Sequence, residues 1–306
     1  MKYEKPALTF DAQADQLLER GLVADRDQLV ERLKCVSYYR LSGYWYPFRL
    51  DDDTFREGTT FELIWRRYVF DRQLRLLSLD AIERFEVAVR TDLTYVLSHS
   101  QGAFGYSDQA NLPNLDGRRY AELIERLRND CRLSKEPFIR HFRDKYGSDH
   151  GLAPYWMVTE LMTFGTLLTL FKGAPKNIKR EIASRYSVSD VVLESWLGSL
   201  NVIRNVCAHH GRLWNRELGF KPKIPNKDYR WHDPVEIPDN RIFGILTLLK
   251  YLLNELAPQS RWPQRLAALL SHYPDIPLPS MGYPSEWESC PIWRVGASAT
   301  EKSSSS

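Results

Sequence analysis

The sequence predicts an all-α protein, a bundle of many helices. Apolar residues recur every three or four positions along most of the 306 residues, which is the period of a helix with one buried face. No segment shows the alternation of apolar and polar residues that is typical of a half-buried strand, and no internal repeat occurs. The stretch from Thr59 to Gln101 contains neither glycine nor proline, so it can form a long helix.

Composition and charge narrow the class of protein. Hydrophobic content of 43% and charged content of 26% are ordinary for a soluble globular protein. No run of about 18 apolar residues exists, so we expect no transmembrane helix and no membrane partner. The first ten residues lack the apolar core of a signal peptide, so we expect a cytoplasmic protein. A net charge of only +3 argues against a protein that coats nucleic acid generally.

Cysteine and histidine spacing gives no sign of a metal. The four cysteines lie far apart with no C-x-x-C pair, and the seven histidines show no H-x-x-x-H spacing. We therefore expect neither a disulfide framework nor a zinc site. The sequence predicts no metal ligands and no cofactor.

Residues 1–58 are expected to form an N-terminal helical and aromatic region. A short helix is predicted from Phe10 to Arg20, because Thr9 can cap its start and Gly21 can end it. A second helix is predicted from about Asp25 to about Tyr39.

The segment from Tyr38 to Phe48 gathers aromatic residues around an arginine. Aromatic rings interleaved with arginine can stack on RNA bases. Such a cluster more often forms the wall of a core, where rings bury a large area. We expect most of these rings in the core, and Arg40, Tyr39 and Tyr44 are our candidates for contact with RNA.

Residues 59–216 are expected to form the helical core. As one helix, the stretch from Thr59 to Gln101 would be about 60 Å long, so a break or bend is expected within it. Glu86 falls inside its apolar arc, with Arg90 one turn later. A buried charge is costly unless it is paired, so this pair is either an internal ion pair or a group that supports a functional site.

Several helices are expected after a loop at residues 102–117. They are predicted from Tyr120 to Arg132, which has a basic face, from Ser134 to Tyr146 with Ser134 as its cap, and from Tyr155 to Lys172, which is the most apolar helix. A basic helix then begins at Pro175. These basic stretches are either phosphate-binding faces or solvated helix surfaces. The RNA-binding candidates in and beside them are Arg118, Arg119, Lys176 and Lys179.

The helix predicted from Asp190 to His210 carries a polar stripe. At about 100° per residue, Asn201, Arg204, Asn205 and His209 fall within roughly 140° of one another. The other flank carries Leu200, Ile203, Val206 and Cys207 and is the expected core side. His210 falls among those apolar residues, so we expect His209 to be the functional histidine and His210 the structural one.

Such a stripe has the groups that cleave RNA without a metal. This reaction needs a base for the 2′-OH proton, an acid for the leaving oxygen, and a cation beside the phosphorus oxygens. His209 can transfer protons near neutral pH, Arg204 can bind phosphate oxygens, and Asn205 can orient either group. An exposed polar helix face would give the same pattern, and arginine and histidine at this spacing occur often by chance.

The C-terminal part is expected to be a connector followed by helices, over residues 217–295. Its first part is rich in proline, and helices are predicted from Ile242 to Leu256 and from Trp262 to Tyr273. Residues 296–306 are expected to be a disordered tail.

The segment R-N-V-C-A-H-H-G-R-L-W-N-R, Arg204 to Arg216, resembles the R-N-x-x-x-H signature of HEPN-superfamily ribonucleases. It is similar in particular to the Abi-like abortive infection proteins of the AbiD/AbiF type. The likeness covers most of residues 5–220 in the family's order and is weaker beyond them. Its other segments are K-P-A-L-T-F (5–10), Y-Y-R-L-S-G-Y-W-Y-P-F (38–48), F-D-R-Q-L-R (70–75), I-E-R-F-E-V-A-V-R (82–90) and P-Y-W-M-V-T-E-L-M-T-F-G (154–165).

This resemblance implies an HEPN-like bundle whose catalytic residues would be Arg204, Asn205 and His209. The family has an acidic-x3-Arg element on an early helix that faces the catalytic one, which implies a supporting role for Glu86 and Arg90. Its R-x-W-N tail implies that the segment after the motif packs beneath the site. The remaining supporting candidates are Asn201, Arg212, Trp214 and Asn215.

The resemblance also implies a function in phage defence or as a toxin, exerted by a metal-independent endoribonuclease. The family builds composite sites from two chains, so a homodimer is expected, and RNA is the expected substrate. A small non-coding RNA that restrains the nuclease is a further expected partner. Two alternatives are a non-catalytic RNA-binding or sensor protein that uses the same helix as a phosphate clamp, and a helical scaffold.

Overall fold

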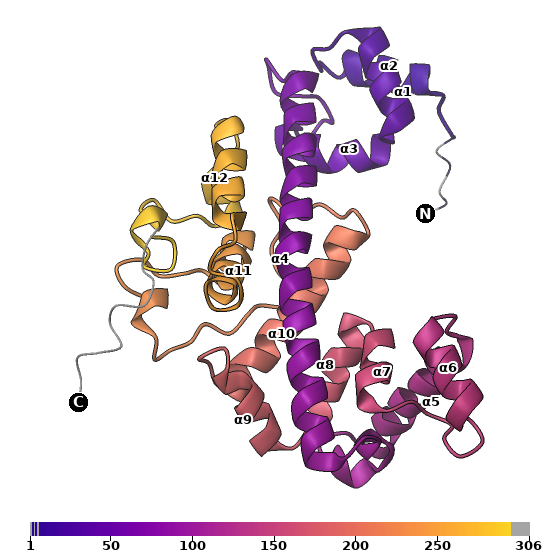
Figure 1. Ribbon diagram of the computed structural model, residues 1–306. Helices are drawn as coiled ribbons and strands as arrows, with labels where there is room; N and C mark the ends of the chain where they lie inside the picture. The colour runs from indigo at the N-terminus through magenta and orange to yellow at the C-terminus, as the bar shows by residue number, and fades with distance from the viewer. Residues whose placement is uncertain (1, 3, 5, 295–306) are drawn as a thin grey trace.

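The computed structural model describes residue 2, residue 4 and residues 6–294, and these fold into a helical assembly (Figure 1). The described residues form twelve α-helices joined by turns and short 3-10 helices, and they contain no strand, so the predicted all-α class is confirmed. Backbone pairing of the strand type is limited in this part to two isolated bridges, Val23 with Thr60 and Arg49 with Phe55. The tail predicted at residues 296–306 lies outside the described residues.

One long helix, α4 (Phe61–Gln101), is the central element of the fold. The Thr60 side chain caps its start by accepting the N–H of Leu63 at 3.2 Å, and Gly102 ends it at a φ of +80°. The helix has 41 residues without interruption, so the expected break is absent. Figure 1 shows α4 running through the molecule from the N-terminal helices to the helices α5–α8.

Three helices form the N-terminal region: α1 (Phe10–Glu19), α2 (Arg26–Cys35) and α3 (Tyr38–Trp45). Thr9 caps α1 as predicted, and Gly21 follows it with a φ of +90°. The second helix is shorter than predicted, because Val36 adopts an extended conformation and ends it. The aromatic segment is therefore a helix of its own, and α3 packs on α4.

The middle of the chain supplies α5 (Gly117–Leu133), α6 (Pro137–Tyr146), α7 (Tyr155–Leu161), α8 (Phe164–Gly173) and α9 (Lys176–Ser184). The single helix predicted from Tyr155 to Lys172 is wrong. Met162 and Thr163 are extended, and the Thr163 hydroxyl accepts the N–H of Thr166 to start α8. At α6 the cap is Glu136 rather than the predicted Ser134, whose hydroxyl instead accepts the N–H of Glu136.

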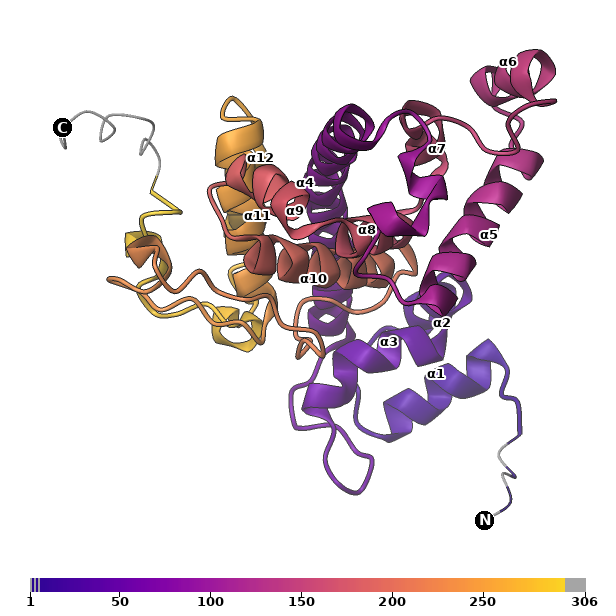
Figure 2. The same ribbon diagram turned by 90° about the horizontal axis from the view of Figure 1, so that it is seen from below.

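The motif helix is α10 (Asp190–Ala208), and its start is capped by Ser189. It packs on the middle of α4, between α8 and α11 (Ile242–Leu256), and Figure 2 shows this crossing in a view along α4. The last helix, α12 (Trp262–His272), also packs on α4. No helix that the structure describes is long and apolar enough to cross a membrane.

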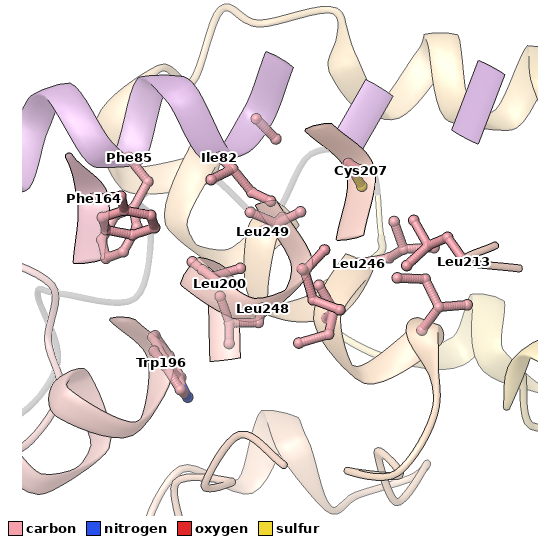
Figure 3. Packing of buried hydrophobic residues seen from close by; sticks show 14 of the residues in the cluster. Ile82, Phe85, Phe164, Trp196, Leu200, Cys207, Leu213, Leu246, Leu248 and Leu249 are labelled. Atoms are coloured by element: carbon pink, nitrogen blue, oxygen red, sulfur yellow. The ribbon is translucent and has the colours of Figure 1, made fainter. Parts of the chain in front are cut away.

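The core that supports α10 comes from three helices. Figure 3 shows Ile82 and Phe85 of α4, Leu200 of α10 and Leu249 of α11 gathered in one cluster, and none of the four exposes more than 1% of its surface. Truncating one such side chain to alanine typically costs about 2–5 kcal/mol. The buried side of α10 is therefore fixed by packing, and only its other side can contact a ligand.

Candidate functional site

The motif lies at the C-terminal end of α10, where the helix closes in a Schellman turn. The N–H of Gly211 donates to the carbonyl of Val206 at 2.7 Å, and the N–H of His210 donates to that of Cys207 at 3.0 Å. His210 occupies the left-handed position of this turn, with a φ of +58°. His209 is the C-cap, the last residue before the chain turns.

The prediction that His210 lies on the core side is wrong. Helical geometry stops at Ala208, so a wheel projected through His210 has no meaning there. His210 is exposed, and its carbonyl accepts the guanidinium of Arg40 at 2.6 Å. The prediction for the rest of this flank is confirmed: Leu200, Ile203 and Cys207 are buried, and Val206 is partly buried against the core.

The candidate catalytic side chains reach the surface of α10. Asn205 and His209 are exposed and Arg204 is half-buried. Arg204 donates to the Asn205 amide oxygen at 3.4 Å, at the long limit for a hydrogen bond. Half-buried Asn201 lies one turn back, and its amide is 3.6 Å from where a Cβ on Gly165 of α8 would stand. The helix thus presents these groups on one side.

A buried carboxylate that the sequence analysis did not single out holds the segment after the motif. Asp71 of α4 is fully buried and accepts the backbone N–H of Trp214 at 2.7 Å and of Leu213 at 3.1 Å on its Oδ1. Its Oδ2 accepts Arg75 at 2.5 Å and the Tyr44 hydroxyl at 2.7 Å. Donors therefore occupy both oxygens, which is the arrangement that suits an ionised carboxylate.

Two effects on the pKa of the Asp71 carboxyl act in opposite directions. Burial raises the pKa of its carboxyl, whereas Arg75, Tyr44 and the two backbone N–H groups act to lower that pKa. Burial, together with the Asp71 charge, raises the pKa of the neighbouring Cys207 thiol to about 12. The groups beneath the motif are therefore buried, and they hold the motif segment in place.

Asp71 and Arg75 have the acidic-x3-Arg spacing that we had assigned to Glu86 and Arg90. Glu86 instead pairs with Arg90 at 2.8 Å, and Arg90 donates to the carbonyl of Thr159 in α7. Within the described part of the chain neither residue hydrogen-bonds to the motif stripe. This geometry matches the internal ion pair that was the alternative interpretation. The segment F-D-R-Q-L-R contains Asp71 and Arg75 at the acidic-x3-Arg spacing. The sequence could not show that this turn of α4 meets the motif, because that depends on where α10 crosses α4.

Two arginines join α3 to the motif segment. Arg40 of α3 bonds to His210 as described, and Arg212 donates to the carbonyl of Gly43. Arg216 reaches back to the carbonyl of Arg212 at 3.5 Å. Among the residues that the structure describes, none of Arg40, Arg204, Arg212 and Arg216 has a carboxylate oxygen within 4.0 Å, whereas sixteen other arginines and lysines of this part of the chain form such ion pairs. We call these four residues the arginine group.

The tail after the motif is packed as the resemblance implied. Trp214 exposes 1% of its surface, and the Arg67 guanidinium lies 5.2 Å from its ring centre. Asn215 accepts Arg241 at 3.4 Å, which links the tail to the start of α11. Trp214 therefore supports the site from below and does not reach a substrate itself.

Two of the predicted RNA contacts are wrong. Tyr44 exposes only 2% of its surface and bonds to Asp71, so its ring is not available to a base. Lys179 pairs with Glu194 of α10 at 3.1 Å, and its side chain is only 14% exposed. Arg118 and Arg119 are exposed but lie near Glu122 and Asp116 at 3.5 and 3.6 Å.

Tyr39 and Lys176 are the remaining candidates, and both are exposed. Tyr39 lies on α3 beside Arg40, close to the motif, whereas Lys176 begins α9 at a different part of the fold. The structure therefore brings Tyr39, Arg40, Arg212 and the motif together, and it places the basic residues of α5 and α9 apart from them.

Comparison with known proteins gives one match. A family model described as Abi-like protein matches residues 31–215, which include α3, α4, α10 and all of the candidate site except Arg216. No curated protein and no solved structure matches the chain.

Proposed function

This chain belongs to the Abi-like protein family, and from that membership we propose that it is a metal-independent endoribonuclease of the HEPN type. Family membership suggests a role in abortive infection, a form of phage defence. The proposal adds the reaction: cleavage of RNA inside the infected cell, which makes the protein a toxin to its host. The proposal also assigns catalysis to Arg204, Asn205 and His209.

The observation that carries this proposal is an exposed histidine beside cations that have no counter-charge. His209 stands at the C-terminal end of α10, and the arginine group lies at that end with no carboxylate oxygen of the described residues within 4.0 Å of its guanidinium nitrogens. Arginine binds phosphate oxygens through paired N–H groups, and histidine transfers protons near neutral pH. A phosphodiester seated on the arginine group would therefore meet a proton-transfer group.

The proposed reaction is an in-line transesterification. A base removes the proton of the 2′-OH, the 2′-oxygen attacks the phosphorus, and the bond to the 5′-oxygen breaks. An acid supplies the proton that the 5′-oxygen takes up, so the products are a 2′,3′-cyclic phosphate and a 5′-hydroxyl. Arg204 would stabilise the charge on the non-bridging oxygens, and Asn205 would orient Arg204.

One histidine cannot stand on both sides of one phosphate. We therefore propose that two chains form a homodimer and that each contributes its His209, one as base and one as acid. Ala208 and Val202 are exposed on α10, and their small or apolar side chains suit a close approach of two such helices. A structured small RNA that restrains the nuclease is part of the proposal, with the arginine group as its contact.

A non-catalytic phosphate clamp is the second candidate, because the arginine group alone would bind RNA. A clamp requires Arg204 and tolerates the loss of His209, whereas the nuclease requires both. The test is cleavage of a defined RNA by purified protein in EDTA, compared for wild type, Arg204→Ala, His209→Ala and His141→Ala. His141 is an exposed histidine of α6 and is the matched control.

We expect cleavage by wild type and the control only, with cyclic phosphate ends on the fragments by mass spectrometry. The all-deoxy version of the substrate should stay intact, because it lacks the nucleophile. Cleavage that EDTA stops and magnesium restores would refute the metal-free reaction. RNA binding without cleavage in every protein would favour the clamp.

A further inference from the structure

The outer face of α3, continued by its C-cap Tyr46 in helical conformation, carries the two most exposed aromatic side chains among the described residues. Tyr39 exposes 88% of its surface and Tyr46 exposes 70%, although their neighbours Tyr44 and Trp45 are buried at 2% and 1%. At about 100° per residue, positions 39, 43 and 46 lie within roughly 60° of one another. The two rings therefore stand on one side of the helix, about 10 Å apart along its axis.

Arg212 lies against the position between these two tyrosines. The residue between them on this face is Gly43, and the Arg212 Cδ is 3.8 Å from where a Cβ on Gly43 would stand, which is van der Waals contact. The Arg212 guanidinium is held there by the carbonyl of Gly43. Tyr39, Arg212 and Tyr46 thus form a row, which we call the stacking strip.

The stacking strip is joined directly to the proposed catalytic end of α10. Arg212 is three residues after His209, and Arg40, next to Tyr39, bonds to the carbonyl of His210. Neither arginine has a carboxylate within 4.0 Å in the described part of the chain, so the strip is aromatic and positive with no opposing charge. An apolar protein partner would leave both cations without a counter-charge, which is costly when they are buried.

We propose that the stacking strip binds unpaired nucleotides of RNA, and so makes single-stranded RNA the substrate of the site. Bases stack on tyrosine rings and on the plane of an arginine guanidinium, and their phosphates neutralise the cations. A duplex hides the faces of its bases, so only an unpaired segment can use both parts of the strip. This inference rests on the proposed function and names its substrate class.

Binding is measured apart from cleavage, with an oligoribonucleotide whose 2′-OH groups are all methylated, so that the nucleophile is absent. One oligonucleotide is unpaired, carries 2-aminopurine and is titrated with protein while its fluorescence is followed. A hairpin of the same composition is titrated in parallel. The proteins are wild type, Tyr39→Ala, Tyr46→Ala, Tyr39→Phe and Tyr39→Leu. Tyr95→Ala is the control, since Tyr95 is 60% exposed on α4.

We expect wild type to bind the unpaired strand more tightly than the hairpin and to quench 2-aminopurine. Each alanine variant of the strip should weaken that binding by about 5- to 100-fold. Tyr39→Phe keeps the ring and should bind as wild type, whereas Tyr39→Leu keeps apolar area but loses stacking and should bind as Tyr39→Ala. Tyr95→Ala should change nothing. Because the tyrosines are exposed, thermal melting should show the same fold stability throughout.

Three results would overturn the proposal that the stacking strip binds unpaired RNA. They are no binding by wild type, equal affinity for the strand and the hairpin, and equal affinity of Tyr39→Leu and wild type for the strand. Failure of the proposed function looks different. If no protein cleaves natural RNA while the binding pattern holds, the strip stands and the nuclease does not. If wild type cleaves RNA and the tyrosine variants bind and cleave equally well, only the strip is refuted.

Discussion

The Asp71 carboxylate on α4 accepts the backbone N–H of Trp214 at 2.7 Å, across a sequence separation of 143 residues. This bond fixes the segment that follows His209 to the long central helix. Asp71 also binds Arg75 and Tyr44, so one buried carboxylate connects α3, α4 and the motif. The site is therefore supported by a charged group in the interior, where removal of one partner is expensive.

We predict that Asp71→Asn strongly destabilises the protein and abolishes cleavage. Asparagine leaves the Arg75 charge buried without a counter-charge and offers only one oxygen to the donors that Asp71 satisfies. A broken buried ion pair typically costs about 3–5 kcal/mol. Urea denaturation measures the free energy of unfolding, and the RNA assay measures activity.

Asp80→Asn is the control for this change. Asp80 pairs with Arg84 and Arg265 at a partly exposed position, so its loss should cost less than about 1 kcal/mol. Equal stability of the Asp71 and Asp80 variants would show that the Asp71 network does not hold the motif segment.

We predict that His210→Gly raises stability and leaves RNA cleavage unchanged. A non-glycine residue at a φ of +58° is strained by roughly 1 kcal/mol, and glycine removes that strain. The Arg40 bond uses the carbonyl of His210, which glycine keeps. His210→Ala, which keeps a Cβ at this φ, is the matched variant and should not gain this stability. A lower melting temperature for His210→Gly would mean that the imidazole contributes packing after all.

The elements that the sequence predicted well are those whose signals are local. The cap of α1 at Thr9 and the full range of α11 follow from one residue type and one periodic run. The break between α7 and α8 was missed because the run is apolar throughout and only Thr163 marks the new start.

The candidate site was predicted in part. The polar stripe on α10 could be found from helical geometry alone. The position of His210 could not, because it depends on where the helix ends, and Asp71 could not, because it depends on which turn of α4 meets α10. Tyr44 and Tyr39 lie in the same aromatic segment, and only the packing of α3 on α4 decides that one is buried and the other exposed.

Thiol reactivity should distinguish the four cysteines. Cys35 is exposed, whereas Cys131, Cys207 and Cys290 are buried. Burial raises the pKa of the Cys207 thiol to about 12, so it stays protonated and inert at a pH where an ordinary thiol ionises. We predict one fast-reacting thiol with Ellman's reagent at pH 8, lost in Cys35→Ser, and four in denaturant. A second fast thiol in the native protein would show that at least one of the three buried cysteines becomes accessible.

The same thiol makes a pH-dependent contribution to stability. The folded-state pKa of Cys207 is raised, so its contribution is complete below the unfolded thiol pKa of about 8.5 and is lost as pH rises toward 12. The free energy of unfolding should therefore fall between pH 9 and pH 10, before most tyrosines ionise, and fall less in Cys207→Ala. Identical slopes for the two proteins would place the alkaline sensitivity elsewhere.

The composite-site proposal predicts that catalysis requires two intact chains. Each chain contributes one His209, and base and acid must stand on opposite sides of the phosphate. Inactive His209→Ala chains added in excess should draw wild-type chains into heterodimers with one histidine. Activity per wild-type chain should then fall toward zero as the mutant fraction rises. His141→Ala chains in the same excess are the control and should cause no loss.

Subunit exchange decides how this mixing result is interpreted, so it is measured independently by energy transfer between chains labelled at Cys35, the exposed cysteine. If chains exchange and activity per wild-type chain is unchanged, each chain works alone and the composite site is wrong. The arginine group would then remain as a phosphate-binding surface, since its bonds to His210, Gly43 and Arg212 are all made within one chain.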